Sequence, residues 1–291
     1  MQLAFKIDQG YYFFKTQAFK INKYIHKPIL QHAADFSPSG DSAARLTLET
    51  KKIMTTNRTI GGLLIAGAIA LLIPYTVLTI IFHYPDILRQ DTASILTKFH
   101  EGGNTLIWTW FAFAITGIPL LPAYILIGQT FENKAPLVRI ATSIGIVGLV
   151  VQMIGLMRWT FVVPMLADTF VNATDLATKA AAIVAFKTIH QFAGVILGEH
   201  LGQLFTIAWT LMISISFSRL KLFPAWVNFL GFVSSFIYIL AQAELFATIM
   251  PHFPVWDLAG FVGSTMWLVW LIVLGVMFFR KGSSPEFSKP H

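Results

Sequence analysis

The sequence predicts an all-α membrane protein, a polytopic transmembrane helical bundle of about six spans with both termini in the cytoplasm. Of its 291 residues, 55% are hydrophobic and only 12% are charged, whereas soluble domains average about 25% charged residues. The apolar runs are about 20 residues long, the length that an α-helix needs to cross a bilayer. A transmembrane β-barrel would instead show runs of about 10 residues with strict alternation.

Six apolar segments carry this prediction, at residues 60–82, 105–128, 140–164, 194–217, 225–247 and 258–279. The fourth belongs to an apolar stretch, residues 181–217, that is too long for one untilted span. We therefore divide it into an amphipathic segment at 177–192 and a span from 194, with a single long tilted helix as the alternative. Between the first two spans, residues 91–100 are expected to form a short surface helix.

The Lys and Arg residues set the predicted orientation, because cytoplasmic connections carry an excess of positive charge. Of the 21 Lys and Arg residues, 16 fall in the N-terminal arm, the second and fourth connections and the C-terminal tail. Four fall in the first and third connections, and Arg158 lies within a span. This distribution accounts for the net charge of +7, so the charge does not indicate nucleic-acid binding.

We expect three parts along the chain: an N-terminal extension at residues 1–53, the transmembrane bundle at 54–282 and a cytoplasmic tail at 283–291. Lysines interleaved with aromatic residues in the extension suit an interfacial helix on an anionic leaflet. The alternative is that Met54, which directly precedes the first span, is the true start and that the extension has no role.

The residues also exclude several kinds of chemistry. The sequence contains no cysteine, so it forms no disulfide, thiolate metal site or cysteine nucleophile. It contains no Walker loop, dinucleotide fingerprint or serine-hydrolase elbow. No cofactor is predicted.

The most informative stretch is residues 190–209, which read HQFAGVILGEHLGQLFTIAW. Ionisable side chains inside hydrocarbon are costly and therefore face the bundle interior or a water-filled cavity. With the predicted topology, polar residues of three spans meet at a similar depth in the outer half. The candidate site residues are Arg158, Glu199, His200, Gln203 and Glu244, with Gln152, Gln242 and His190 at the edge of the cluster.

Charge pairing is the simplest expectation within this cluster. Arg158 should neutralise Glu199, Glu244 or both, because an unpaired charge at that depth is unfavourable. One arginine against two glutamates leaves an imbalance, so one carboxyl should be protonated or His200 should supply a second positive charge. Glu199 and Gln203 share a helix face, whereas His200 should point about 100° away. Adjacent Glu199 and His200 cannot face one ion together, so no metal site is predicted.

Three glycines on the fourth span, Gly194, Gly198 and Gly202, recur every fourth residue. Small residues in this pattern let membrane helices pack closely. We therefore expect this face to contact a neighbouring span, which places Glu199 inside the bundle. Whether the cluster is a structural ion pair or a ligand pocket stays open.

Five stretches of the chain carry a family resemblance: FHEGGNTLIWTWFAFA (99–114), VVQMIGLMRWTFVVP (150–164), HQFAGVILGEHLGQLFT (190–206), AQAELFA (241–247) and FPVWDLAG (253–260). Residues 54–281 resemble the bacterial multi-pass membrane proteins catalogued as domain of unknown function 4386. The resemblance implies a bundle of six or seven spans in the bacterial inner (plasma) membrane. It implies no activity, because the family has none assigned. The N-terminal extension lies outside it, which favours a start at Met54.

Three functions are compatible with these observations. The first is a non-catalytic protein with an outward-facing polar pocket, acting as a sensor, as a binder of a small molecule or lipid, or as a partner subunit. The second is a small proton-coupled transporter that uses Glu199 or Glu244, which would need polar groups in the inner half as well. The third is an intramembrane enzyme with Glu199 and His200 as an acid–base pair. Membrane lipids and a small-molecule ligand are the expected partners, and no oligomeric state is predicted.

Overall fold

A computed structural model describes residues 40–283 of the chain. The chain divides into two units, Met1–Lys52 and Ile53–His291. Most of the predicted N-terminal extension and nearly all of the predicted tail lie outside the described residues, so both assignments stay predictions. The bundle and its candidate site belong to the second unit.

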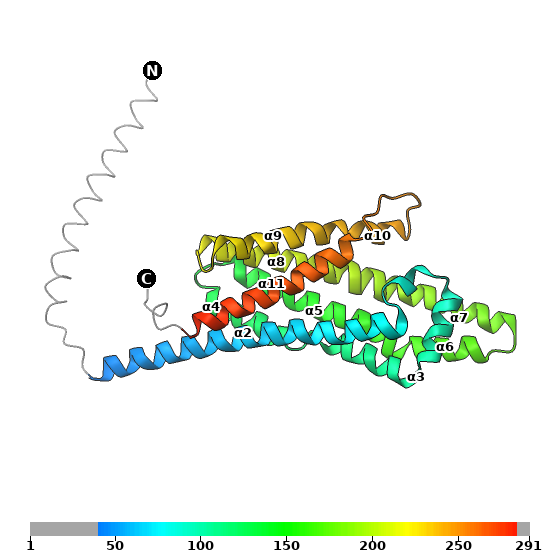
Figure 1. Cartoon of the computed structure of the whole chain (residues 1–291), viewed down its shortest axis with the longest axis horizontal. Helices are drawn as coiled ribbons and strands as arrows, with labels where there is room; N and C mark the ends of the chain where they lie inside the picture. The colour runs from blue at the N-terminus through cyan, green and yellow to red at the C-terminus, as the bar shows by residue number, and fades with distance from the viewer. Residues whose placement is uncertain (1–39, 284–291) are drawn as a thin grey trace, which may run out of the picture. The chain divides into compact units, whose positions relative to one another are not determined.

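Every regular element within residues 40–283 is helical (Figure 1). In chain order the elements are α2 (Gly40–Phe82), the 3₁₀-helix η1 (Asp86–Arg89), α3 (Thr92–Ile115), α4 (Leu120–Phe131), α5 (Leu137–Phe161), α6 (Val163–Asn172), α7 (Leu176–Ile189), the π-helix η2 (His190–Leu201), α8 (Gly202–Arg219), α9 (Ala225–Leu240), α10 (Gln242–Ala247) and α11 (Ala259–Lys281).

Six helical stretches are long and apolar enough to cross a bilayer, which confirms the predicted all-α bundle of six spans. They are Arg45–Phe82, Thr92–Phe131, Leu137–Asn172, Leu176–Arg219, Ala225–Ala247 and Ala259–Lys281. The first four are much longer than the predicted spans. Leu176–Arg219 alone has 44 residues and would extend about 66 Å as an α-helix, about twice the thickness of the hydrocarbon core.

The predicted division of the fourth span between residues 192 and 194 is wrong, and the single long helix is correct. The chain stays helical from Leu176 through η2 to Arg219. The polar residues near its start, among them Lys179 and Lys187, belong to the same continuous helix.

The short helix predicted at residues 91–100 is confirmed as a separate helical segment at the start of α3. Asp91 caps it, accepting hydrogen bonds from the backbone nitrogen of Ser94 at 3.0 Å and from its hydroxyl at 2.6 Å. These bonds hold the pKa of the Asp91 carboxyl below its usual value. Gly103 has a non-helical backbone, with φ of 51° and ψ of −147°, and separates this segment from the apolar helix that follows.

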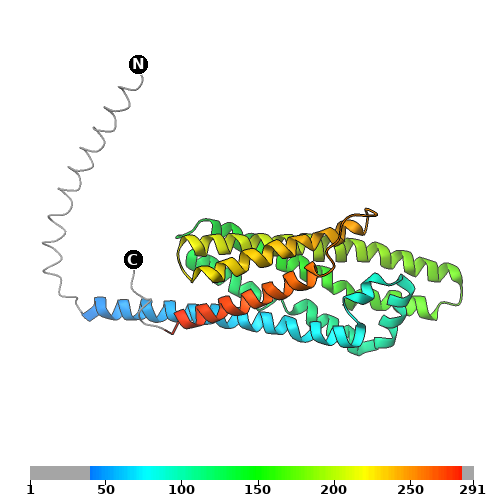
Figure 2. The same ribbon diagram turned by 45° about the horizontal axis from the view of Figure 1, so that its top comes forward.

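The first turns of α3, together with η1, α6 and α7, form a distal cap, which lies beyond α10 and the start of α11 in both views (Figures 1 and 2). An aromatic core holds the cap to the bundle. The rings of Trp110 and Trp159 stack at 4.7 Å, and Phe99 stacks on Trp159 at 5.7 Å. Phe186 of α7 also packs edge-on against Trp159.

A second apolar core fills the other half of the bundle, between α2, α4, α5, α8, α9 and α11. Its centre holds Tyr124, whose ring stacks on Trp209 at 3.8 Å, and Trp270. On the fourth span, Phe186 belongs to the distal core and Trp209 to the second core. The polar stretch His190–Leu201 therefore lies between the two apolar cores.

Candidate functional site

The π-helix η2 is the local feature on which the site is built. π-Helices are rare and occur mostly as single turns at functional positions, whereas η2 runs for 12 residues. It lies directly against α5, because a Cβ added at Gly155 would come within 2.6 Å of the Ala193 carbonyl oxygen and of the Gly198 Cα. The predicted close packing of the glycine face is thus confirmed, and its partner is α5.

Arg158 on α5 is 5% exposed, and its guanidinium occupies the space that Gly194 leaves. A Cβ on Gly194 would lie 2.5 Å from the Arg158 Nη2. Nη1 donates to the carbonyl oxygen of Gly155, Nη2 lies 3.5 Å from Nδ1 of His190, and Nε has no hydrogen-bond partner. The guanidinium also lies 5.2 Å from the ring centre of Trp159. The positive charge is therefore buried and incompletely bonded.

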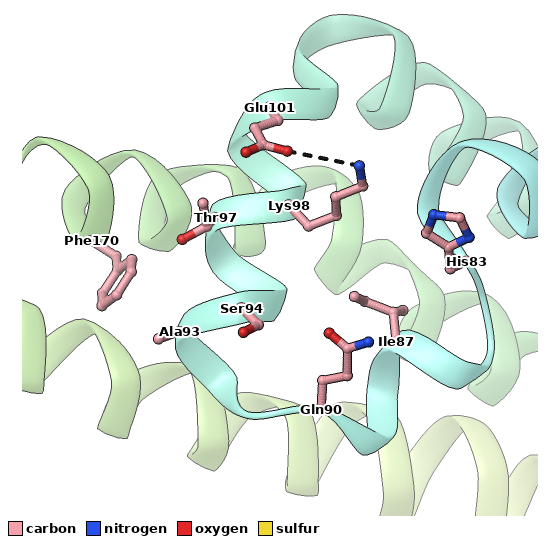
Figure 3. Close-up of a pocket in the computed structure, with 9 residues that line it drawn as sticks. All are labelled: His83, Ile87, Gln90, Ala93, Ser94, Thr97, Lys98, Glu101 and Phe170. Atoms are coloured by element: carbon pink, nitrogen blue, oxygen red, sulfur yellow. Dashed lines mark ion pairs between the residues drawn. The ribbon is translucent and has the colours of Figure 1, made fainter.

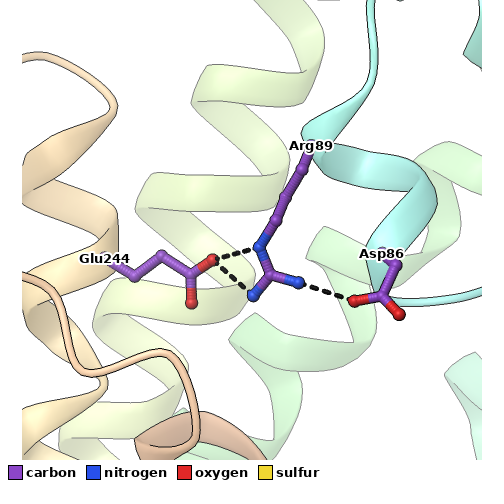
Figure 4. A network of polar contacts seen from close by, with 3 residues as sticks. All are labelled: Asp86, Arg89 and Glu244. Carbon is purple, nitrogen blue, oxygen red and sulfur yellow. Dashed lines mark hydrogen bonds and ion pairs between the residues drawn. The ribbon is translucent and has the colours of Figure 1, made fainter.

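The predicted pairing of Arg158 with Glu244 is wrong. Glu244 instead accepts hydrogen bonds from Nε and Nη2 of Arg89, at 3.1 and 2.8 Å. Arg89 also contacts Asp86 at 2.7 Å (Figure 4). Burial alone would lower the pKa of Arg89, but its hydrogen bond to Glu244 and the nearby carboxylates outweigh that effect and raise it. This pair joins η1 to α10.

Glu199 on η2 makes no hydrogen bond and no direct ion pair within residues 40–283. Arg158 attracts it only from beyond ion-pair distance. Both charges act on Tyr84, which is partly buried in the connection before η1. Burial raises the pKa of the Tyr84 phenol, the Glu199 carboxylate raises it further, and the Arg158 guanidinium opposes them. Tyr84 therefore lies within electrostatic range of both charges.

A second polar group centres on Gln242 of α10. Nδ1 of His200 lies 2.7 Å from the Gln242 side-chain oxygen, and the Gln242 amide nitrogen donates to Gln203 at 2.7 Å. Because a carbonyl oxygen only accepts, Nδ1 of His200 carries a proton in this arrangement. His200 and Gln203, one helical turn apart, thus contact the same amide of Gln242.

The predicted residues thus fall into two groups. Arg158, His190 and Glu199 form the charged group, and His200, Gln203 and Gln242 form the amide group. Gln152 lies apart, donating to the Thr206 hydroxyl at 3.0 Å, and Glu244 is engaged by Arg89. The described residues hold no group of three or more His, Cys, Asp or Glu side chains placed to bind a metal ion.

Sequence reasoning missed Tyr84 and Arg89, which lie in a short connection and match no motif. It also missed a shallow groove of about 510 Å³ in the distal cap, lined by residues of η1 and α3 and by Phe170 (Figure 3). Within the groove Lys98 pairs with Glu101 at 3.8 Å. The groove includes none of the predicted site residues, and its two charges offset each other.

The matched family model is described as Domain of unknown function (DUF4386) and covers residues 59–275. The chain belongs to this family. No curated protein and no solved structure matches the chain. The DUF4386 range contains both the charged group and the amide group, and its description states no activity. The charged group and the amide group are therefore the features from which a function can be inferred.

Proposed function

We propose that this DUF4386 chain is a non-catalytic membrane protein that binds an anionic group, carried by a lipid or a small molecule, at Arg158. The single observation that carries the proposal is that the Arg158 side chain is buried without a carboxylate partner. Arg158 is 5% exposed, yet no carboxylate of the described residues lies within ion-pair distance. A buried unpaired charge costs several kcal/mol, and a bound anion would offset that cost.

The depth of Arg158 supports a ligand from the membrane surface. From Leu137, where α5 begins, the helix rises about 30 Å to Arg158 at 1.5 Å per residue. From Arg219, where α8 ends, Glu199 is also about 30 Å away. This distance equals the thickness of the hydrocarbon core. We place both charges at the outer surface of a bacterial inner membrane, where lipid headgroups begin.

The test is ligand-dependent thermal stability of the purified protein in detergent. Phosphatidylglycerol or inorganic phosphate should raise the Tm of the wild type by mass action, and Arg158→Gln should remove that rise. Arg139→Gln is the matched control, because Arg139 lies on the same helix but is exposed and bonded to Glu132 at 3.1 Å. Gly194→Ala is a second probe, since its Cβ would displace the Arg158 guanidinium. An equal rise in all four proteins, or no rise in the wild type, would contradict the proposal.

A transporter is the second candidate, and one observation favours it. Buried hydroxyls continue from the amide group along α8, at Thr206, Thr210 and Ser214. The indole nitrogen of Trp267 donates to Thr210 at 3.1 Å. The inner half thus holds more polar groups than expected from the sequence. Proteoliposomes with an internal pH dye separate the candidates: a transporter gives a Glu199-dependent proton flux, whereas a binding protein gives none.

Nothing in the site favours the enzyme hypothesis over these two. Glu199 and His200 share no hydrogen bond, and His200 is engaged by Gln242. No nucleophile within the described chain is bonded to Nε2 of His200. Glu199 and His200 are adjacent in sequence, but their side chains are not bonded to each other as an acid–base pair.

A further inference from the structure

We infer that the ligand is zwitterionic, with its anionic group on Arg158 and an ammonium group of the same molecule on Glu199. This inference rests on the proposed function and names its ligand class. Gly198, which adjoins Glu199, packs against Gly155, which precedes Arg158 by about one helical turn, and neither charge has a direct ionic partner among residues 40–283.

The packing around the two charges sets where each one lies. The Arg158 guanidinium donates to the Gly155 carbonyl and fills the space above Gly194. Glu199 belongs to η2, whose backbone packs against α5 at Gly155 and Gly198. In this arrangement no hydrogen bond or ion pair joins the two side chains.

Charge balance decides between an anion and a zwitterion. Arg158 and Glu199 together are neutral, so an anion alone would leave the site with a net negative charge and with Glu199 unpaired. The neighbouring network does not supply a cation for Glu199, because it holds one positive charge, on Arg89, against two carboxylates, on Asp86 and Glu244. A molecule that carries both charges leaves the site neutral and gives each side chain a partner. At the edge of the hydrocarbon, where charge is poorly solvated, the neutral combination is favoured.

An aromatic cluster borders Arg158. The Trp159 ring centre lies 5.2 Å from the guanidinium, Trp110 stacks on Trp159, and Tyr84 packs edge-on against Trp110 at 5.1 Å. Aromatic faces attract ammonium groups, so this cluster suits a ligand that carries a cation. The same chemistry occurs in an ethanolamine phospholipid headgroup and in a free phosphoethanolamine ester, so the source has to be separated by experiment.

The test compares two soluble phosphodiester headgroups by calorimetry on the purified full chain: glycerophosphoethanolamine, which carries an ammonium group, and glycerophosphoglycerol, which carries hydroxyls in its place. The wild type should bind the ethanolamine ester about tenfold more tightly, the effect of one charge-assisted hydrogen bond. Glu199→Gln should abolish this preference but keep the common phosphate affinity, and Arg158→Gln should abolish binding of both. Glu132→Gln, which neutralises the partner of Arg139, should leave the preference intact.

The source is tested in parallel with nanodiscs of phosphatidylethanolamine or phosphatidylglycerol, by the Tm of the wild type. Stabilisation by phosphatidylethanolamine without binding of the soluble ester supports a lipid ligand, and binding of both supports a free solute as well. Equal, Arg158-dependent binding of the two headgroups would overturn the zwitterion and leave the proposed function standing. Absence of binding by headgroups and lipids alike would overturn both. The ligands are compared on the wild-type protein, so this result does not depend on whether any variant folds.

Discussion

At the scale of single residues, the sequence identified Arg158 as an energetically unfavourable charge within a span, but it did not identify the residues that contact it. Arg158 was singled out because an arginine within a span is unfavourable, and it is buried as expected. The predicted partner Glu244 is taken by Arg89 instead. Pairing depends on how α10 turns relative to η1, and no residue pattern in either segment encodes that angle. Hydropathy places Arg158 inside the bundle, but it does not show which charged side chain of another element lies beside it.

Gly155 is a position at which the site does not tolerate a larger residue. Gly155→Ala would place a methyl group 2.6 Å from the backbone of η2, which cannot move aside like a flexible side chain. We expect a clear drop in Tm, because overpacking typically costs about 1–3 kcal/mol, together with loss of Arg158-dependent ligand stabilisation. Gly62→Ala is the matched control: nothing lies within 4 Å of its added Cβ, and alanine favours a helix. Equal Tm values for both variants would show that η2 does not depend on this contact.

At the scale of elements, hydropathy predicted that a fourth span exists but not its helical form. Its apolar length was predicted, but not its continuity from Leu176 nor the π-helix at His190–Leu201. The glycine spacing predicted that this face packs closely on a neighbour, and it packs on α5. No residue pattern in the same stretch indicated the π-helical form.

The short helix α10 links the amide group to the connection between the first two spans. Gln242 bonds His200 and Gln203, while Glu244 bonds Arg89. Replacing Arg89 and Glu244 by alanine, singly and together, should give a coupling energy of about 0.2–1 kcal/mol, as for partly exposed ion pairs. The coupling should weaken as salt is added. Hydrogen exchange of the α10 amides measures it, and the exposed Arg139–Glu132 pair is the control. Strictly additive effects at low salt would mean that the pair does not hold α10.

At the scale of the whole molecule, six spans follow from composition because lipid permits few alternatives to apolar helices. The distal cap was not predicted, since helices that continue beyond the bilayer give no signal at the membrane boundary. Its aromatic core, with Trp110 stacked on Trp159, brings together residues that the sequence separates by a full span. The cytoplasmic placement of the termini and the role of the N-terminal extension stay predictions from charge and from resemblance.

The central claim is that a ligand satisfies Arg158. The most direct measurement is an experimental structure of the full chain in nanodiscs that contain phosphatidylethanolamine and phosphatidylglycerol. We predict non-protein density with an anionic group about 3 Å from the Arg158 guanidinium, adjoining the Glu199 carboxylate. A guanidinium bonded directly to Glu199, with no such density beside it, would contradict the account and make the cluster a structural ion pair.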